Sequence, residues 1–180
     1  MDRANHYEAA FEAYLREQKL PCIAVDETRR SALGDGFVKS LDFLVVPEDG
    51  SRLLIDIKGR RFPGGPPKKP RYVWENWVSR EDVDCLLQWQ ECLGSDSTGL
   101  FVFVYELAPS IRLTEGTADM WTFRGKNYLA RAVTVETYQR WMKQRSPKWE
   151  TVCLASDVYR EIVQPFSTFA RVESEILWPA

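Results

Sequence analysis

Two short apolar runs, each with an aspartate and separated by a turn sequence, constrain the fold of this chain most strongly. The first run is residues 41–46 (LDFLVV), the turn is 47–51 (PEDGS) and the second run is 52–60 (RLLIDIKGR). This pattern predicts a β-hairpin. Burying a carboxylate in a strand is costly unless a charged group meets it. The hairpin therefore predicts a charged site around Asp42 and Asp56.

The length of the turn decides whether the two aspartates meet. Side chains alternate faces along a strand, so Asp56 and Lys58 point the same way. A two-residue turn would separate Asp42 from Asp56. A three-residue loop, 48–50 with Gly50 in the left-handed conformation, sets the two acids opposite each other. The sequence permits both registers, and chemistry that uses both acids requires the second.

Hydrophobic periodicity and turn residues predict the other elements. Helices are predicted at 5–18, from Ser79 to Gly94, at 135–145 and at 157–164, and strands at 22–28, 41–46, 52–58, 100–105, 120–123 and 128–133. Asn5 is the predicted N-cap of the first helix, and Ser79 with Asp82 forms a capping-box pair at the second. The order helix, hairpin, helix, strand predicts an α/β fold with a mixed central β-sheet flanked by helices.

Composition sets broad limits. A chain of 180 residues predicts one domain, 1–180, and 24 Lys and Arg against 26 Asp and Glu point to no particular partner. No run approaches the length of a membrane span, and the N-terminus lacks a signal-peptide pattern. The four cysteines have no C-x-x-C spacing, which predicts reduced, buried thiols and a cytoplasmic location, and disfavours a zinc site. No P-loop, dinucleotide fingerprint or G-x-S-x-G favours a small-molecule enzyme.

The ordered set of motifs resembles a known superfamily. A helical glutamate, then Leu41-Asp42, then Asp56-Ile57-Lys58 on the next strand, is similar to the PD-(D/E)XK nucleases, which have the restriction-endonuclease-like fold. Within that superfamily the layout looks closest to the short archaeal Holliday-junction resolvases, although those tend to have glutamate at the second acid. The string HYEAAFE at 6–12 also resembles the signature of the HYExAFE family. The resemblance covers a core of about 5–105 and leaves about 106–180 as a C-terminal α/β extension.

The resemblance implies a catalytic metal site. Asp42 and Asp56 would be metal ligands, and the main-chain carbonyl of Ile57 would add a third oxygen. Hard oxygen donors of this kind suit Mg²⁺ or Mn²⁺. Lys58 would orient or deprotonate the attacking water, or neutralise charge at the scissile phosphate, and we expect its pKa to be lowered.

The first helix offers two further acids. Glu8 is preferred as a catalytic and metal-site residue, because Phe11 and Leu15 follow it by three and seven residues, as in the resolvases. Glu12 is the second candidate, and its plainer interpretation is a solvated glutamate paired with Arg16. His6, the only histidine, excludes nucleases that need several histidines.

A Pro/Gly-rich loop at 59–73 is strongly basic. Its candidate phosphate-binding residues are Arg60, Arg61, Lys68, Lys69 and Arg71. Tyr72, Trp74 and Trp77 would supply base stacking. The alternative is a solubilising loop whose aromatic residues cap the core.

Two functions follow from these motifs. The favoured one is a Mg²⁺-dependent nuclease that hydrolyses phosphodiester bonds in DNA by metal-activated water, with preference for structure or ends over sequence. The alternative is a catalytically silent nuclease-fold protein that acts as a nucleic-acid-binding or scaffold module. Intact Asp42, Asp56 and Lys58 favour activity. The sequence does not decide whether the substrate is DNA or RNA, or whether cleavage is internal or from the ends. It also leaves open whether the chain forms a homodimer.

Overall fold

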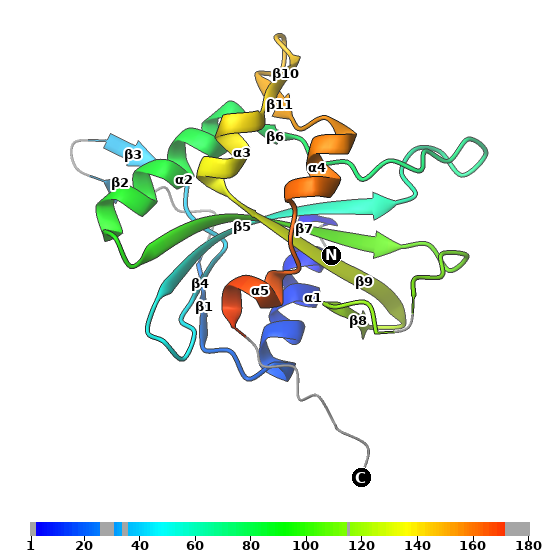
Figure 1. Ribbon diagram of the computed structural model, residues 1–180, viewed down its shortest axis with the longest axis horizontal. Coiled ribbons are helices and arrows are strands. Elements are labelled where there is room, and N and C mark those ends of the chain that lie inside the picture. Colours follow the sequence, from blue (N-terminus) through cyan, green and yellow to red (C-terminus); the bar gives the residue numbers. More distant parts are fainter. Residues whose placement is uncertain (1–2, 26–30, 34–35, 115, 172–180) are drawn as a thin grey trace.

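A curled six-stranded mixed sheet forms the centre of the computed structural model, which describes residues 3–25, 31–33, 36–114 and 116–171 (Figure 1). In spatial order its strands are β1 (Cys22–Ala24), β4 (Phe43–Val45), β5 (Arg52–Phe62), β7 (Ser97–Leu107), β9 (Lys126–Thr134) and β8 (Met120–Phe123). β5 and β7 are parallel, and every other neighbouring pair is antiparallel. The predicted α/β fold with a mixed central sheet is confirmed.

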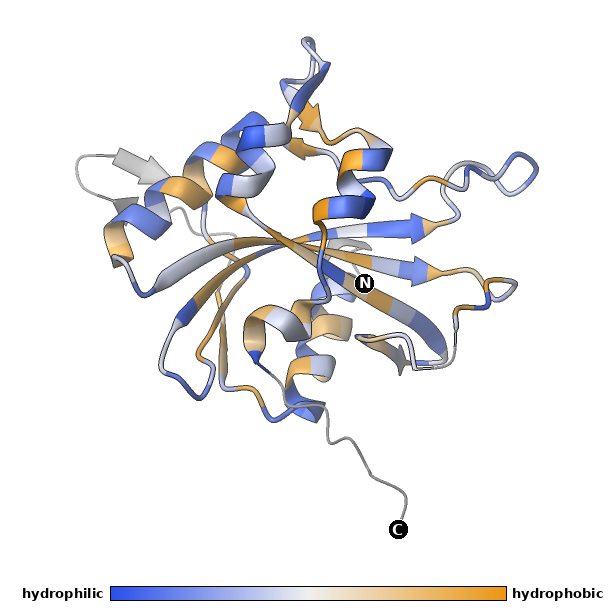
Figure 2. Ribbon diagram, viewed as in Figure 1, coloured by the Kyte–Doolittle hydropathy of each residue, from blue (hydrophilic) through white to orange (hydrophobic). Residues whose placement is uncertain are grey.

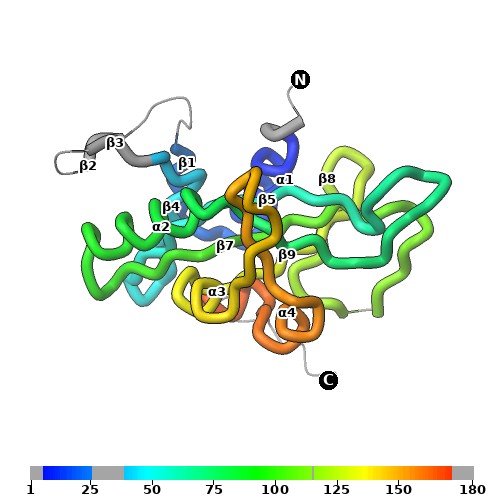
Figure 3. The backbone as a smooth tube through the Cα atoms, turned by 90° about the horizontal axis from the view of Figure 1, so that it is seen from above, coloured from blue at the N-terminus to red at the C-terminus, as the bar shows by residue number. Residues whose placement is uncertain are grey.

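Helices cover both faces of this sheet. α1 (Arg3–Glu17) and α5 (Phe166–Ala170) lie on one face, and α2 (Arg80–Leu93), α3 (Val135–Trp141) and α4 (Ser156–Ile162) lie on the other (Figure 1). A small sheet of β10 (Lys143–Ser146), β11 (Thr151–Cys153) and β6 (Val78–Ser79) stands above α2 and α3, over the middle of the molecule in Figure 3. β2 (Ser31–Leu33) and β3 (Gly36–Val38), which the sequence did not predict, form a separate pair.

Two apolar layers hold the helices to the sheet, whose middle strands are coloured hydrophobic in Figure 2. Phe11 and Leu15 of α1 pack with Val102 in one layer. Val83 of α2 packs with Phe101 in the other. All of β7 from Leu100 to Tyr105 is buried, as expected of a strand covered on both faces. Each fully buried side chain of this size contributes about 1.5–3 kcal/mol.

The hairpin adopts the register of the three-residue loop. Phe43 pairs with Ile55 and Val45 with Leu53, which is the register that brings Asp42 to the level of Asp56. Gly50 has a φ of 77°, the left-handed conformation that this loop needs. β4 begins at Phe43, two residues later than predicted, because the chain bends at Asp42.

The predicted ends of one strand and one helix are wrong. The strand predicted at 52–58 continues to Phe62, because pairing with β7 outweighs the Pro/Gly content of the sequence that follows. The helix predicted at 135–145 ends at Trp141, and Lys143–Ser146 form β10 instead. Tertiary pairing of β10 with β11 overrides the local helical pattern.

The N-terminal predictions are partly confirmed. α1 begins at Arg3, so Asn5 lies inside the helix and is not its N-cap. The strand predicted at 22–28 ends at Ala24, and residues 26–28 lie outside the described residues. The four cysteines are free as predicted, but none is buried. Within the described ranges, no helix is long and apolar enough to cross a membrane.

Gly59 lets α1 approach β5 beside the predicted site. A methyl group at Gly59 would collide with the ring of Tyr7 on α1. We expect Gly59→Ala to lower the free energy of unfolding by about 1–3 kcal/mol, as overpacking does, in urea denaturation. The same substitution in a Tyr7→Ala background should cost much less. An equal cost in both backgrounds would contradict the contact.

Candidate active site

A buried chain of alternating charges lies on the face of β5 that α2 covers. Lys58 Nζ lies 2.6 Å from Asp56 Oδ1 and 3.0 Å from Asp82 Oδ2. The other oxygen of Asp82 lies 2.7 Å from Lys39 Nζ. The side chains of Asp56, Lys58 and Asp82 are 8–12% exposed, whereas that of Lys39 is 42% exposed. Strand β5, helix α2 and the segment before β4 therefore meet through ion pairs.

Asp42 directly precedes β4 and lies at the edge of β5. Its Oδ2 accepts a hydrogen bond from the Ile57 N–H, and its own N–H donates to the Ile55 carbonyl at 2.9 Å. In the part of the chain that the structure describes, no strand pairs with this edge of β5 beyond Ile55. The carboxylate of Asp42 thus satisfies a backbone donor that the short β4 leaves open, next to Asp56.

The cluster combines three buried carboxylates, of Asp42, Asp56 and Asp82, with two lysines. Burial raises the pKa of Asp56, and the attraction of Lys58 only partly offsets it. Burial also acts on Asp82, but Lys58 and Lys39 outweigh it and hold the Asp82 pKa well below its usual range. For Lys39, burial is outweighed by the nearby carboxylates, Asp42 among them, so its pKa is raised.

In the protein alone the pKa of Lys58 is raised, whereas the predicted lowering applies to Lys58 beside a bound ion and stays a prediction. Burial by itself would lower the pKa of the ammonium, but the charges of Asp56 and Asp82 outweigh burial and raise it. The prediction did not include Asp82 among the neighbours of Lys58. The ammonium is therefore the stable form at neutral pH.

Asp82 is the main site residue that sequence reasoning missed. Its predicted cap is present: Asp82 N–H donates to Ser79 Oγ at 3.0 Å, and Ser79 N–H donates to Asp82 Oδ2 at 2.9 Å. Asp82 also lies four residues before Leu86, on the buried stripe of α2, and an acid in such a position needs a cation. That spacing was the available signal.

The two glutamates of α1 differ in their surroundings. Glu12 pairs with Arg16 at 2.5 Å near the surface, as its plainer interpretation predicted. Glu8 is half-buried on α1, which covers the sheet face opposite to Asp56 and Lys58. The catalytic role of Glu8 stays a prediction.

The basic residues of the 59–73 segment fall into two groups. Arg60 is engaged by the protein itself: its guanidinium donates to the carbonyls of Gly59 and Trp77 and lies 4.2 Å from the Trp77 ring centroid. The exposed group is Arg61, Lys68, Lys69 and Arg71. Arg71 is additionally paired with Glu75 at 2.8 Å.

The neighbouring aromatic residues are mostly packed. Trp74 stacks on Phe62 with ring centroids 3.6 Å apart, in the manner of the alternative in which the loop aromatics cap the core. Tyr72 is 66% exposed.

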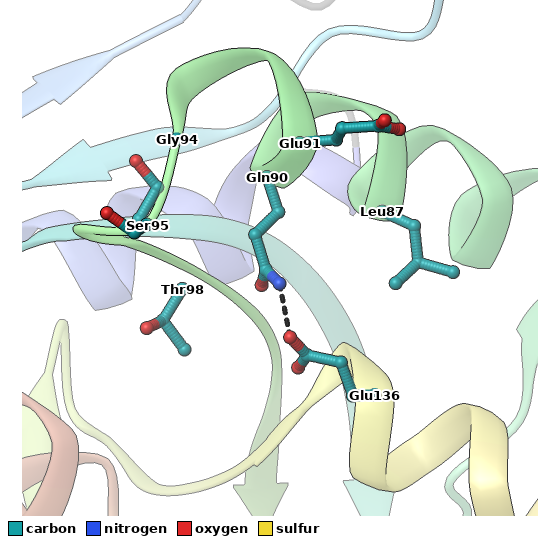
Figure 4. Close-up of a pocket in the computed structure, with 8 residues that line it drawn as sticks. Leu87, Gln90, Glu91, Gly94, Ser95, Thr98 and Glu136 are labelled. Carbon is teal, nitrogen blue, oxygen red and sulfur yellow. Dashed lines mark hydrogen bonds between the residues drawn. The ribbon is translucent and has the colours of Figure 1, made fainter.

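A separate hollow of about 560 Å³ lies at the end of α2 (Figure 4). Gln90 there donates to Glu136 and accepts the Gly99 N–H at 2.6 Å, so its polar groups are used internally. None of the predicted site residues lines this hollow. Across the described residues, no set of three or more His, Cys, Asp or Glu groups is arranged to hold a metal ion.

The fold can now be compared with known structures. The Holliday junction resolvase Hjc of Archaeoglobus fulgidus matches with a TM-score of 0.52 and 13% sequence identity, over 94% of this chain and 97% of the resolvase. The two chains share a fold. The match with the resolvase extends well beyond the predicted core of 5–105. No protein-family model matches the sequence, and no curated protein does, so the resemblance to the HYExAFE family is not confirmed.

Asp82 gives the cluster a measurable pH dependence. Its pKa is lowered on folding, so its ionised form adds stability above the unfolded value of about 4, and this stability is lost as the pH falls below that value. Asp82→Asn keeps a capping acceptor but removes the charge. We expect it to lower the free energy of unfolding by about 1–3 kcal/mol at pH 7. The deficit should shrink toward pH 2 in urea titrations.

The matched control for this substitution is Asp84→Asn, an exposed site on the same helix. It should change stability little at either pH. A deficit of Asp82→Asn that is constant from pH 7 to pH 2 would contradict the ion pairs.

Proposed function

We propose that this chain is a divalent-metal-dependent nuclease that hydrolyses phosphodiester bonds in DNA. The observation that supports it best is the buried cluster of Asp42, Asp56 and Lys58 at the open edge of β5. The cluster occurs on a fold shared with a Holliday junction resolvase. Buried carboxylates are found where positive charge meets them, and Asp42 accepts the Ile57 N–H beside Asp56.

The donor set suits a hard divalent cation. Asp42 and Asp56 would hold it with the Ile57 carbonyl, all three being oxygen ligands of the kind that Mg²⁺ or Mn²⁺ prefers. Burial disfavours the ionised form of Asp56, so a cation there would relieve an electrostatic cost. When bound, the ion would supply positive charge that activates water and stabilises charge on the phosphate.

The contacts of Lys58 suit it to a positioning role. Its ammonium is held between Asp56 and Asp82, which favours orientation of water or neutralisation of a phosphate oxygen. Asp82 would act as a positioning residue, since it holds the Lys58 ammonium from the α2 side.

The second candidate is a catalytically silent nucleic-acid-binding module. It is favoured by one observation: Lys58 already binds Asp56, which is one of the proposed metal ligands. Both candidates bind nucleic acid and differ in cleavage.

Cleavage of branched, nicked and linear DNA, with Mg²⁺ or with EDTA, separates the two candidates. We expect Mg²⁺-dependent cleavage by the wild type. Asp56→Asn should reduce it by about 10³-fold or more, since it removes a proposed ligand, and thermal melts verify that the variant is folded at the assay temperature. Asp84→Asn should cleave normally. Binding of DNA without cleavage in Mg²⁺ or Mn²⁺ would favour the silent module.

The exposed part of the basic loop should contribute affinity. Duplex binding weakens as salt rises, and the measure is the slope of log K against log salt concentration. Replacing Arg61, Lys68 and Lys69 by Ser should reduce the size of this slope by about 2.7, because each phosphate contact contributes about 0.9. Arg60→Ser should instead lower stability, because its guanidinium binds the Trp77 carbonyl. An unchanged slope in the triple variant, measured by fluorescence anisotropy, would identify the loop as a solvated surface.

A further inference from the structure

The β10–β11 hairpin and the end of α3 form a second basic surface that the proposed active site does not use. We define the hairpin surface as Arg140, Trp141, Lys143, Arg145, Lys148 and Trp149. All six residues are exposed, and the exposed fraction reaches 50% for Trp141 and 69% for Trp149. Exposure of a large apolar ring to water costs free energy. The exposed indole rings of Trp141, at the end of α3, and Trp149, on the projecting hairpin, therefore indicate a binding surface.

Its charge is mainly positive. Residues 140–153, which span the end of α3 and the hairpin, contain four Lys and Arg and one acid, Glu150. Within the described ranges, none of these four cations forms an ion pair, whereas Arg16, Arg71 and Lys126 are all paired. The hairpin surface therefore fits a polyanion.

Two cations of this surface lie beside indole rings, one within the surface and one next to it. The Arg145 guanidinium lies 5.1 Å from the Trp77 ring centroid, and Lys148 Nζ lies 5.4 Å from the centroid of Trp149. Positive groups beside aromatic faces are the combination with which proteins bind single-stranded nucleic acid, since bases stack on the rings and phosphates meet the cations. Bases inside a duplex stack on each other and cannot use such rings.

The hairpin is fixed to the active site through backbone pairing. Thr151 of β11 pairs with Ser79 of β6, and the Arg80 N–H donates to the Glu150 carbonyl at 2.9 Å. Ser79 is also the cap of α2 that binds Asp82, which in turn holds Lys58. A strand bound on the hairpin would thus lie at a defined position relative to the cluster.

A hollow of about 260 Å³ connects the hairpin to the basic loop. Arg71 and Arg145 both line it, together with Trp74, Trp77 and Glu75, the acid that pairs with Arg71. Segments distant in sequence therefore border one depression, in which Arg145 has no acid partner among the described residues and the hairpin meets the basic loop.

We propose that the hairpin surface binds an unpaired DNA strand, with bases stacked on Trp149 and Trp141 and phosphates at Arg145, Lys148 and Lys143. This rests on the proposed function and names its substrate class: DNA in which a single-stranded segment adjoins a duplex. The hairpin surface holds the unpaired strand while the duplex lies toward the basic loop.

Stacking is tested with the full chain in EDTA, by fluorescence anisotropy of labelled oligothymidylate, a splayed duplex and a blunt duplex. Trp149→Ala should weaken binding of oligothymidylate and the splayed duplex roughly fivefold or more, the effect of losing one stacked base. Its affinity for the blunt duplex should change less than about twofold. Trp149→Phe should restore most of the affinity, because it restores an aromatic face. Thermal melts verify that both variants fold.

The charges are tested by Arg145→Gln with Lys148→Gln. For single-strand binding, this double substitution should reduce the size of the slope of log K against log salt concentration by about 1.4, at roughly 0.7 per phosphate contact. The matched control removes two exposed cations at the end of α1, on the other face of the sheet, by Arg16→Gln with Lys19→Gln. The control should leave the slope unchanged.

The outcomes separate this inference from the proposed function. The hairpin site is overturned if Trp149→Ala binds oligothymidylate as tightly as the wild type does, or if it loses as much affinity for the blunt duplex as for oligothymidylate. Either result would leave the nuclease proposal standing if the wild type cleaves DNA. If Trp149→Ala loses single-strand binding and the wild type does not cleave DNA, the hairpin site is supported and the nuclease proposal is overturned. An effect of the control pair equal to that of the hairpin pair overturns the site as well.

Discussion

The Lys58 ammonium, held between Asp56 and Asp82, is the interaction on which the arrangement of this molecule depends. It is buried, and it joins the central strand β5 to the first turn of α2. Removing one partner from a buried ion pair leaves an uncompensated charge, which costs about 3–5 kcal/mol. The same first turn of α2 follows directly from β6, which pairs with β11. One cation therefore fixes the position of the central strand, a helix and a projecting hairpin relative to each other.

The ion pairs also limit the chemistry. Lys58 binds Oδ1 of Asp56, so a cation that binds this carboxylate would use its remaining lone pairs or displace the ammonium. Asp42 faces a similar choice, because its Oδ2 already accepts the Ile57 N–H. Each acid is thus satisfied by the protein in a way that substitutes for part of a metal's charge. Such an arrangement lets three buried carboxylates coexist without an ion, and the raised pKa of Asp56 records the remaining cost.

Local rules predicted the parts of the site that depend on neighbours in sequence. The left-handed Gly50 and the parity of the loop predicted the hairpin register, and the Ser79 cap predicted the start of α2. They failed where a distant element decides the outcome. Asp82 was assigned one role, in the cap, because the cap is local and Lys58 is 24 positions away in the chain. The basic loop was predicted to begin at residue 59, yet pairing with β7 keeps 59–62 in the strand.

The hairpin surface is a second feature that local sequence rules did not predict. A near-neutral composition gave no reason to expect a nucleic-acid-binding surface, and the segment after residue 105 matched no motif. Charge nevertheless acts over a Debye length of about 10 Å at 0.1 M salt, so local density matters more than the total. Residues 140–153 hold four cations and one acid, and β11 places them beside the strand that leads into α2. Their position relative to Asp82 and Lys58 comes from the pairing of β11 with β6, and no pattern within the segment could have specified it.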